Sequence, residues 1–240
     1  MMTTLLLILM LAMCASLIQR VSGFGFGIFV MMFFPYILPS YSVSTTLSGV
    51  LAGTTALIIA IQGWRHIQWR LMMPLLAVNI AVSFIAIEYM SSLADGTIKK
   101  CFGAMFIAIA IYFLLRGNKA HVPQTWWIKG GLGALSGVMG GMFAMPGPPL
   151  VLYCISHIND KKEYIATLQA FSVILNIFYT IFRAKVGFFD DEMPLWWCAG
   201  VSGALIGTAI GKRIMERING EVLKRIIYAM LLISGTAAMV

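Results

Sequence analysis

The sequence predicts an all-α polytopic membrane protein with two inverted repeats, each made of a broken helix pair followed by three transmembrane helices. Three observations lead to this prediction. Of the 240 residues, 60% are hydrophobic and only 11% are charged, whereas a soluble domain has about 25% charged residues. Apolar stretches of membrane-spanning length recur along the whole chain. Glycine- and proline-rich segments interrupt two of these stretches at corresponding places.

The composition excludes several classes of protein. The four cysteines, at positions 14, 101, 154 and 198, form no short-spaced pair, so we predict no disulfide scaffold, redox motif, metal site or cofactor. The sequence shows no catalytic triad or phosphate-binding loop, and we therefore expect no enzyme. The net charge of +8 indicates basic cytoplasmic loops rather than nucleic-acid binding, because membrane proteins concentrate Lys and Arg in those loops.

Eight apolar stretches divide into two repeats of similar plan. Most are about 20 residues long, the length that crosses a hydrocarbon core of ~30 Å at 1.5 Å per residue. Repeat 1, over residues 1–118, has a broken helix pair at 3–38 and spans at 43–62, 71–90 and 98–116. Repeat 2, over residues 126–240, has a broken helix pair at 126–156 and spans at 164–182, 193–211 and 222–240.

The stretches 3–38 and 126–156 are too long for single spans, since they would form helices of about 54 Å and 46 Å. Each contains a glycine cluster, Ser22–Gly27 in the first and Gly137–Gly141 in the second. Glycine in a helix interior costs about 1 kcal/mol relative to alanine. We therefore predict that each stretch forms two short helices joined at the glycines, which either cross the membrane twice or dip in and return.

The distribution of Lys and Arg favours this broken-helix topology. If each long stretch returns to the side where it began, twelve basic residues lie inside and four outside. If each crosses once, seven lie inside and nine outside, which the positive-inside rule disfavours. The preferred topology predicts a multi-pass protein of a bacterial-type inner membrane with both termini outside. No Lys or Arg precedes the first apolar stretch, so we expect a permanent membrane segment there and not a cleaved signal peptide.

The two repeats are expected to have opposite orientations. Ser22-Gly23 and Ser136-Gly137 lie 114 residues apart, each within an overlong stretch, and the first repeat begins outside whereas the second begins inside. Inverted repeats with broken helices are the architecture of many secondary transporters, which hold substrate near the membrane midplane. The alternative is that eight stretches simply divide into two groups of four.

The candidate binding site centres on the segment Met145-Pro146-Gly147-Pro148-Pro149. Its prolines cannot continue a helix, but Pro148 or Pro149 can open a new half-helix. A helix that begins within the membrane presents free N–H groups and a partial positive charge, which suit a small anion. We expect three glycines of the first cluster to supply the opposing half of the site: Gly23, Gly25 and Gly27. The alternatives are a packed kink without ligand at the prolines and close helix packing at the glycines.

Polar residues at helical spacing follow each break. In the second repeat they are Gln169, Ser172, Asn176, Thr180 and Arg183, and in the first the series begins at Thr45. We expect Thr45, Gln169 and Asn176 to bind substrate, because polar side chains within a span usually face the interior of the bundle. Arg20 and Arg183 are candidate charge partners, unless they extend to an interface. The alternative for any single Ser or Thr is hydrogen bonding between helices. No Asp or Glu lies in the middle of a predicted span, which disfavours cation transport and a carboxylate proton relay.

With these motifs the chain resembles the TauE/SafE family of membrane anion exporters and permeases. The resemblance rests on Gly23–Gly27, on Ser136–Gly141 and on Met145–Pro149, and the plan of two halves extends it over nearly the whole chain. It implies transport of sulfite, sulfoacetate, another organosulfonate or a related small anion, with coupling to protons. Thiosulfate carriers of a related type use cysteines, and Cys154 follows the proline motif here.

The expected function is therefore a secondary transporter that exports a small sulfur-containing anion by alternating access, with one repeat rocking against the other. The alternatives are an anion channel, a permease for another small carboxylate or sulfur oxyanion such as thiosulfate, and a structural subunit of a larger membrane complex. The expected partners are the small anion, the lipid bilayer and coupling protons, and no oligomeric state is predicted.

Overall fold

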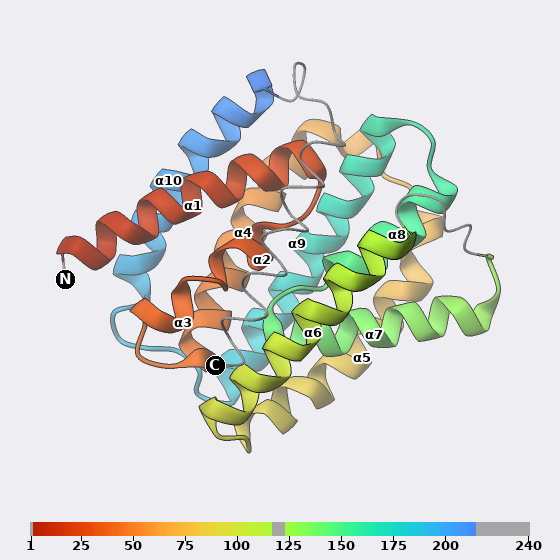
Figure 1. The fold of residues 1–240 in the computed structure, drawn as a ribbon. Helices are drawn as coiled ribbons and strands as arrows, with labels where there is room; N and C mark the ends of the chain where they lie inside the picture. The colour runs from red at the N-terminus through yellow and green to blue at the C-terminus, as the bar shows by residue number, and fades with distance from the viewer. Residues whose placement is uncertain (1, 117–122, 215–240) are drawn as a thin grey trace.

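The computed structural model describes residues 2–116 and 123–214 as a bundle of helices, and no strand occurs in those residues (Figure 1). Five of the described helices are long and apolar enough to cross a membrane. They are α1 (Met2–Ser22), α4 (Tyr41–Gly63), α5 (Trp69–Ser91), α9 (Lys161–Lys185) and α10 (Met193–Ile214). The prediction of an all-α polytopic membrane protein is confirmed.

The predicted simple spans coincide with observed helices, except for 222–240, which lies outside the described residues. Four of these helices, α4, α5, α6 (Asp95–Arg116) and α9, begin two or three residues before their apolar stretches, and in α4 and α9 a polar cap lies just outside the stretch. Ser40 Oγ accepts a hydrogen bond from the Val43 N–H (3.1 Å) at the start of α4, and Asp160 caps α9 in the same way. The other described helices are α2 (Phe26–Val30), α3 (Phe34–Ile37), the 3-10 helix η1 (Trp64–His66), α7 (Trp126–Phe143) and α8 (Gly147–His157).

The first long stretch breaks at its glycines, as predicted, but its first helix is not short. With 21 residues, α1 is a full-length span, and the two short helices α2 and α3 follow it. Gly23 and Gly25 have φ values of 83° and 102°, in the left-handed region that side chains disfavour. The turn between α1 and α2 therefore requires these glycines.

The second long stretch breaks later than predicted, and the prediction of a break at Gly137–Gly141 is wrong. These glycines lie inside α7, which packs along α5. A Cβ at Gly137 would lie only 2.8 Å from the Asn79 carbonyl oxygen, so the glycines serve close helix packing, the alternative considered above. The break lies at Ala144–Pro146, where Ala144 has a φ of 57°. The prolines then begin α8 as predicted, because proline fits the first turn of a helix.

Three helix pairs build the bundle: α1 packs on α10, α5 on α7, and α4 on α9 (Figure 1). In two of these pairs, glycines four residues apart on one helix face carbonyl oxygens four residues apart on the other. On α10 they are Gly203, Gly207 and Gly211, which face Leu9, Met13 and Leu17 of α1; on α7 they are Gly133, Gly137 and Gly141, which face Leu75, Asn79 and Ser83 of α5. The absence of side chains lets these backbones approach closely.

Candidate functional site

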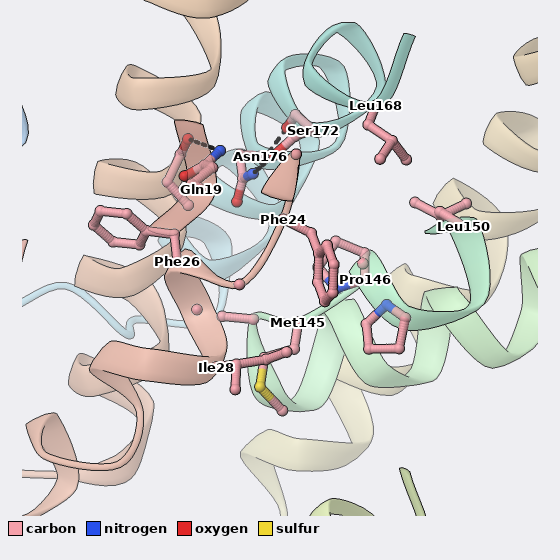
Figure 2. A pocket seen from close by; sticks show the side chains of 17 residues that line it. Gln19, Phe24, Phe26, Ile28, Met145, Pro146, Leu150, Leu168, Ser172 and Asn176 are labelled. Carbon is pink, nitrogen blue, oxygen red and sulfur yellow. Dashed lines mark hydrogen bonds between the residues drawn. The ribbon is translucent and has the colours of Figure 1, made fainter. Parts of the chain in front are cut away.

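A cavity of about 50 Å³ lies where the break of the first half meets the break of the second (Figure 2). Since one water molecule needs roughly 10–15 Å³ of such space, the cavity has room for about three to five waters or a solute of a few heavy atoms. The lining residues are Gln19, Gly23, Phe24, Gly25, Phe26, Gly27, Ile28, Ala52, Ala144, Met145, Pro146, Gly147, Pro148, Leu150, Leu168, Ser172 and Asn176.

The breaks contact each other directly at two glycines. A Cβ at Gly27 would collide with the carbonyl oxygen of Ala144, and a Cβ at Gly147 would lie 3.3 Å from Cβ of Phe24. Figure 2 shows Phe24 between the two segments, on the side of Pro146. Position 27 therefore requires glycine for the close approach of these two segments of the chain. The size of the cavity depends on this approach.

The polar side chains that line the cavity are the amides of Gln19 and Asn176 and the hydroxyl of Ser172, and none of its lining side chains is charged. α2 begins at Phe26 and α8 at Gly147, and both residues line the cavity. The first N–H groups of a helix have no acceptor within the helix and carry a partial positive charge. In α8, Pro148 and Pro149 have no N–H, so Gly147 supplies the N–H of that turn. No group of three metal-ligating side chains occurs among the described residues.

Eight of the ten residues that the sequence singled out for substrate binding line this cavity. They are Gly23, Gly25, Gly27, Met145, Pro146, Gly147, Pro148 and Asn176. Gln169 lies behind the lining: its Nε2 donates to the Gly23 carbonyl (2.7 Å) and its Oε1 accepts from Gln19 Nε2 (2.8 Å). Thr45 does not line the cavity, and its hydroxyl donates to the Ser42 carbonyl (2.9 Å).

The two candidate charge partners lie outside the lining. Arg183 is only 1% exposed, and its Nη2 donates to the Gly140 and Gly141 carbonyls (3.0 and 2.9 Å) at the C-terminal end of α7. Its Nη1 donates to the Thr45 carbonyl (3.2 Å). The positive charge therefore meets the negative end of a helix dipole. Arg20 donates from Nη2 to Gln62 Oε1 (2.9 Å) and lines a second cavity.

A chain of three hydrogen bonds, two of them fully buried, holds the start of α8. Tyr179 Oη donates to Asn79 Oδ1 (2.7 Å), Asn79 Nδ2 donates to Ser136 Oγ (2.8 Å), and Ser136 Oγ donates to the Pro146 carbonyl (2.7 Å). The sequence did not indicate Tyr179 or Gln19. Gln19 could have been found as an amide inside an apolar stretch, one turn before the glycine cluster, since such a group is costly in a span.

The chain is similar to a protein family and to one relative over nearly its whole length. A family model described as "Sulfite exporter TauE/SafE" matches residues 8–238. The "Probable sulfite/organosulfonate exporter TauE" of Cupriavidus necator is 25% identical over 232 residues, which are 92% of this chain and 88% of that protein. No solved structure matches the chain. From the extent of the family match, the chain belongs to the sulfite exporter TauE/SafE family of membrane transporters.

Proposed function

We propose that this protein exports a small sulfur-containing anion, sulfite or an organosulfonate, through the cavity between its two broken helices. One observation carries the proposal: two breaks more than 110 residues apart in the sequence meet around one cavity with helix starts and no charged lining side chain. Backbone N–H groups at the helix starts attract an anion without a fixed opposite charge. Binding without a fixed opposite charge is weak enough for release, and a transport site must release its ligand as well as bind it.

The size of the cavity supports sulfite as the smallest substrate of this closed form. Room for about three to five waters suits a sulfur atom with three oxygens. A sulfoacetate or another organosulfonate adds a carbon chain, and its passage requires the cavity to open. Opening and closing around a buried site is the motion of alternating access.

The helix pairs support the two inverted repeats. If α1 corresponds to α7 and α5 to α10, then the α1–α10 and α5–α7 contacts are equivalent, and α4–α9 is equivalent to itself. An arrangement of this kind is expected when a pseudo-two-fold axis passes between α4 and α9. The C-terminal end of α1, at Arg20, also shares a cavity with Lys161 and Lys162. By the positive-inside rule this supports a cytoplasmic position of that end and an N-terminus outside.

The test is flux of radiolabelled sulfite from proteoliposomes, with and without a pH gradient. We expect saturable efflux that a pH gradient accelerates and that unlabelled organosulfonates inhibit. Gly147→Leu fills the cavity and should abolish efflux, whereas the matched variant Gly131→Leu, at a site with no atom near its Cβ, should keep it. Normal efflux in Gly147→Leu would show that the anion does not pass through this cavity. Single-channel currents in a bilayer would identify a channel instead of a carrier.

A further inference from the structure

A second cavity, of about 500 Å³, lies where the C-terminal ends of α1 and α4 meet the N-terminal end of α9. We call it the vestibule. Its polar lining is formed by Arg20, Gln62, His66, Asp160, Lys161 and Lys162. The vestibule is about ten times larger than the first cavity, and residues of α1, α4 and α9 line both.

Arg20 is the most unusual residue of the vestibule. Its side chain is only 8% exposed. Nη2 donates to Gln62 Oε1 (2.9 Å), whereas Nε and Nη1 are buried and have no hydrogen-bond partner among the described residues. Buried charged donors in native proteins are nearly always satisfied. The Nε–H and Nη1–H groups point from different edges of the guanidinium, so an oxyanion in the vestibule would supply an acceptor to one of them.

The charge of the vestibule also favours an anion. Arg20, Lys161 and Lys162 are cationic, and Asp160 is the one carboxylate in the described lining. Asp160 Oδ1 already accepts hydrogen bonds from the backbone N–H groups of Lys162 (2.8 Å) and Glu163 (2.9 Å). The start of the 25-residue helix α9 adds a partial positive charge at the same place.

The vestibule and the first cavity meet α1 at adjacent residues. Gln19 lines the first cavity and its neighbour Arg20 lines the vestibule. Gln19 Nε2 donates to Gln169 Oε1 on α9 (2.8 Å) and to the Ala52 carbonyl on α4 (3.4 Å). The Gln19 amide therefore ties α1, α4 and α9 together at the first cavity, one residue from Arg20.

We propose that the vestibule is a second oxyanion site, in which Arg20, with Lys161 and Lys162, holds an anion before it passes the Gln19 amide to the first cavity. The loading role rests on the proposed function, whereas binding of an oxyanion in the vestibule does not. Two sources carry the required chemistry: a free sulfur oxyanion and the phosphate of an anionic lipid headgroup, whose charge no choline offsets.

Equilibrium binding of radiolabelled sulfite to the full chain in lipid nanodiscs tests the proposal. Gly147→Leu serves as the background, because its first cavity is filled and the remaining binding reports on the vestibule. One set of nanodiscs contains phosphatidylcholine alone, and the other also contains anionic phosphatidylglycerol. Adding Arg20→Gln should weaken sulfite binding about tenfold, as expected for loss of charge-assisted hydrogen bonds, and Arg20→Lys should recover part of it.

Two further variants keep the test decisive if Arg20→Gln does not fold. The double variant Lys161→Gln/Lys162→Gln changes exposed side chains and should weaken binding in the same direction. Lys185→Gln, an exposed lysine at the opposite end of α9, is the matched control and should leave binding unchanged. The difference between variants and control should shrink at high salt, because counterions screen the exposed charges.

The outcomes separate the sources and the two proposals. If sulfite binding depends on Arg20 and is equal in both kinds of nanodisc, the ligand of the vestibule is the free anion. If phosphatidylglycerol lowers the sulfite binding that depends on Arg20, the ligand is the lipid phosphate. Two results in the Gly147→Leu background would overturn the proposal that the vestibule binds an oxyanion. One is the absence of sulfite binding, and the other is binding that neither Arg20→Gln nor the lysine variant changes. If Arg20-dependent binding occurs but wild-type proteoliposomes show no flux, the proposed function fails and the vestibule stands.

Discussion

At the scale of single residues, Gly27 controls the approach of the two breaks. Gly27→Ala places a methyl group against the Ala144 carbonyl oxygen, a backbone atom that cannot rotate away. Overpacking of this kind costs about 1–3 kcal/mol, and we expect sulfite efflux from proteoliposomes to fall by about a hundredfold, since misplacement near a site by ~1 Å has effects of that order. Gly131→Ala meets no atom and should transport normally. Normal efflux in Gly27→Ala would show that the contact is not needed.

Arg183 is a second residue whose role follows from its contacts. Its guanidinium connects the end of α7 to α4 through the carbonyls of Gly140, Gly141 and Thr45. Lysine keeps the charge but not the planar fork, so Arg183→Lys cannot keep all of these buried hydrogen bonds and should lower the free energy of unfolding by about 1–3 kcal/mol. Thermal unfolding in detergent measures this, with Lys185→Arg at an exposed position as the control. Equal melting temperatures would mean that the charge alone suffices.

At the scale of elements, the hydrogen-bonded chain from Tyr179 to the Pro146 carbonyl determines where α8 begins. Ser136→Ala removes both the donor to Pro146 and the acceptor for Asn79. We expect the start of α8 to shift and KM for sulfite to rise about tenfold, which corresponds to about 1.4 kcal/mol of lost binding. Ser202→Ala is the control, because the Ser202 hydroxyl is exposed and bonds only within α10. An unchanged KM in Ser136→Ala would show that the prolines position α8 without the chain.

The N-terminal cap of α9 predicts a pH dependence. Asp160 lies outside the membrane-spanning segments, and its hydrogen bonds from the backbone N–H groups of Glu163 and Lys162, with the nearby Lys162 and His66, hold its pKa below the ordinary value of 3.8. The cap therefore stabilises the folded protein above that value, and the effect is lost as the pH falls through the lowered folded-state pKa. Asp160→Ala should melt at a lower temperature than wild type at neutral pH and at a similar one in acid. A pH-independent difference would contradict this account, and Asp160→Asn, a neutral cap, isolates the charge.

The sequence predicted the helices better than their breaks. Hydropathy and length located α4, α5, α6, α9 and α10 because each is a single apolar span. A glycine cluster has two physical explanations, a turn or a close helix approach, and the sequence of one chain does not say which neighbour a glycine faces. The first cluster forms a turn at Gly23 and Gly25, whereas the second cluster packs against α5 at Gly137. The position of Gln169 behind the cavity likewise depends on Gln19, which lies 150 residues away in the sequence.

At the scale of the whole molecule, the tight helix pairs constrain which parts move. α1 and α10 come from different halves, as do α5 and α7, and both pairs are joined by glycines that bring backbones into contact. Close-packed interfaces resist sliding. Rocking of one complete half against the other would separate both pairs. We therefore expect each pair to move as a unit relative to the central α4–α9 pair, with the cavity opening at the breaks.

A cross-link within one pair tests this expectation. A Cβ at Gly133 would lie 3.1 Å from Cβ of Val78, somewhat closer than the 3.5–4.5 Å typical of disulfides, so the double variant Val78→Cys/Gly133→Cys should form a disulfide after a small shift, in a background without the four native cysteines. If α5 and α7 move together, sulfite efflux should be equal in the oxidised and reduced proteins. Efflux that stops on oxidation and returns on reduction would show that the α5–α7 interface itself opens, as it must when one half rocks against the other.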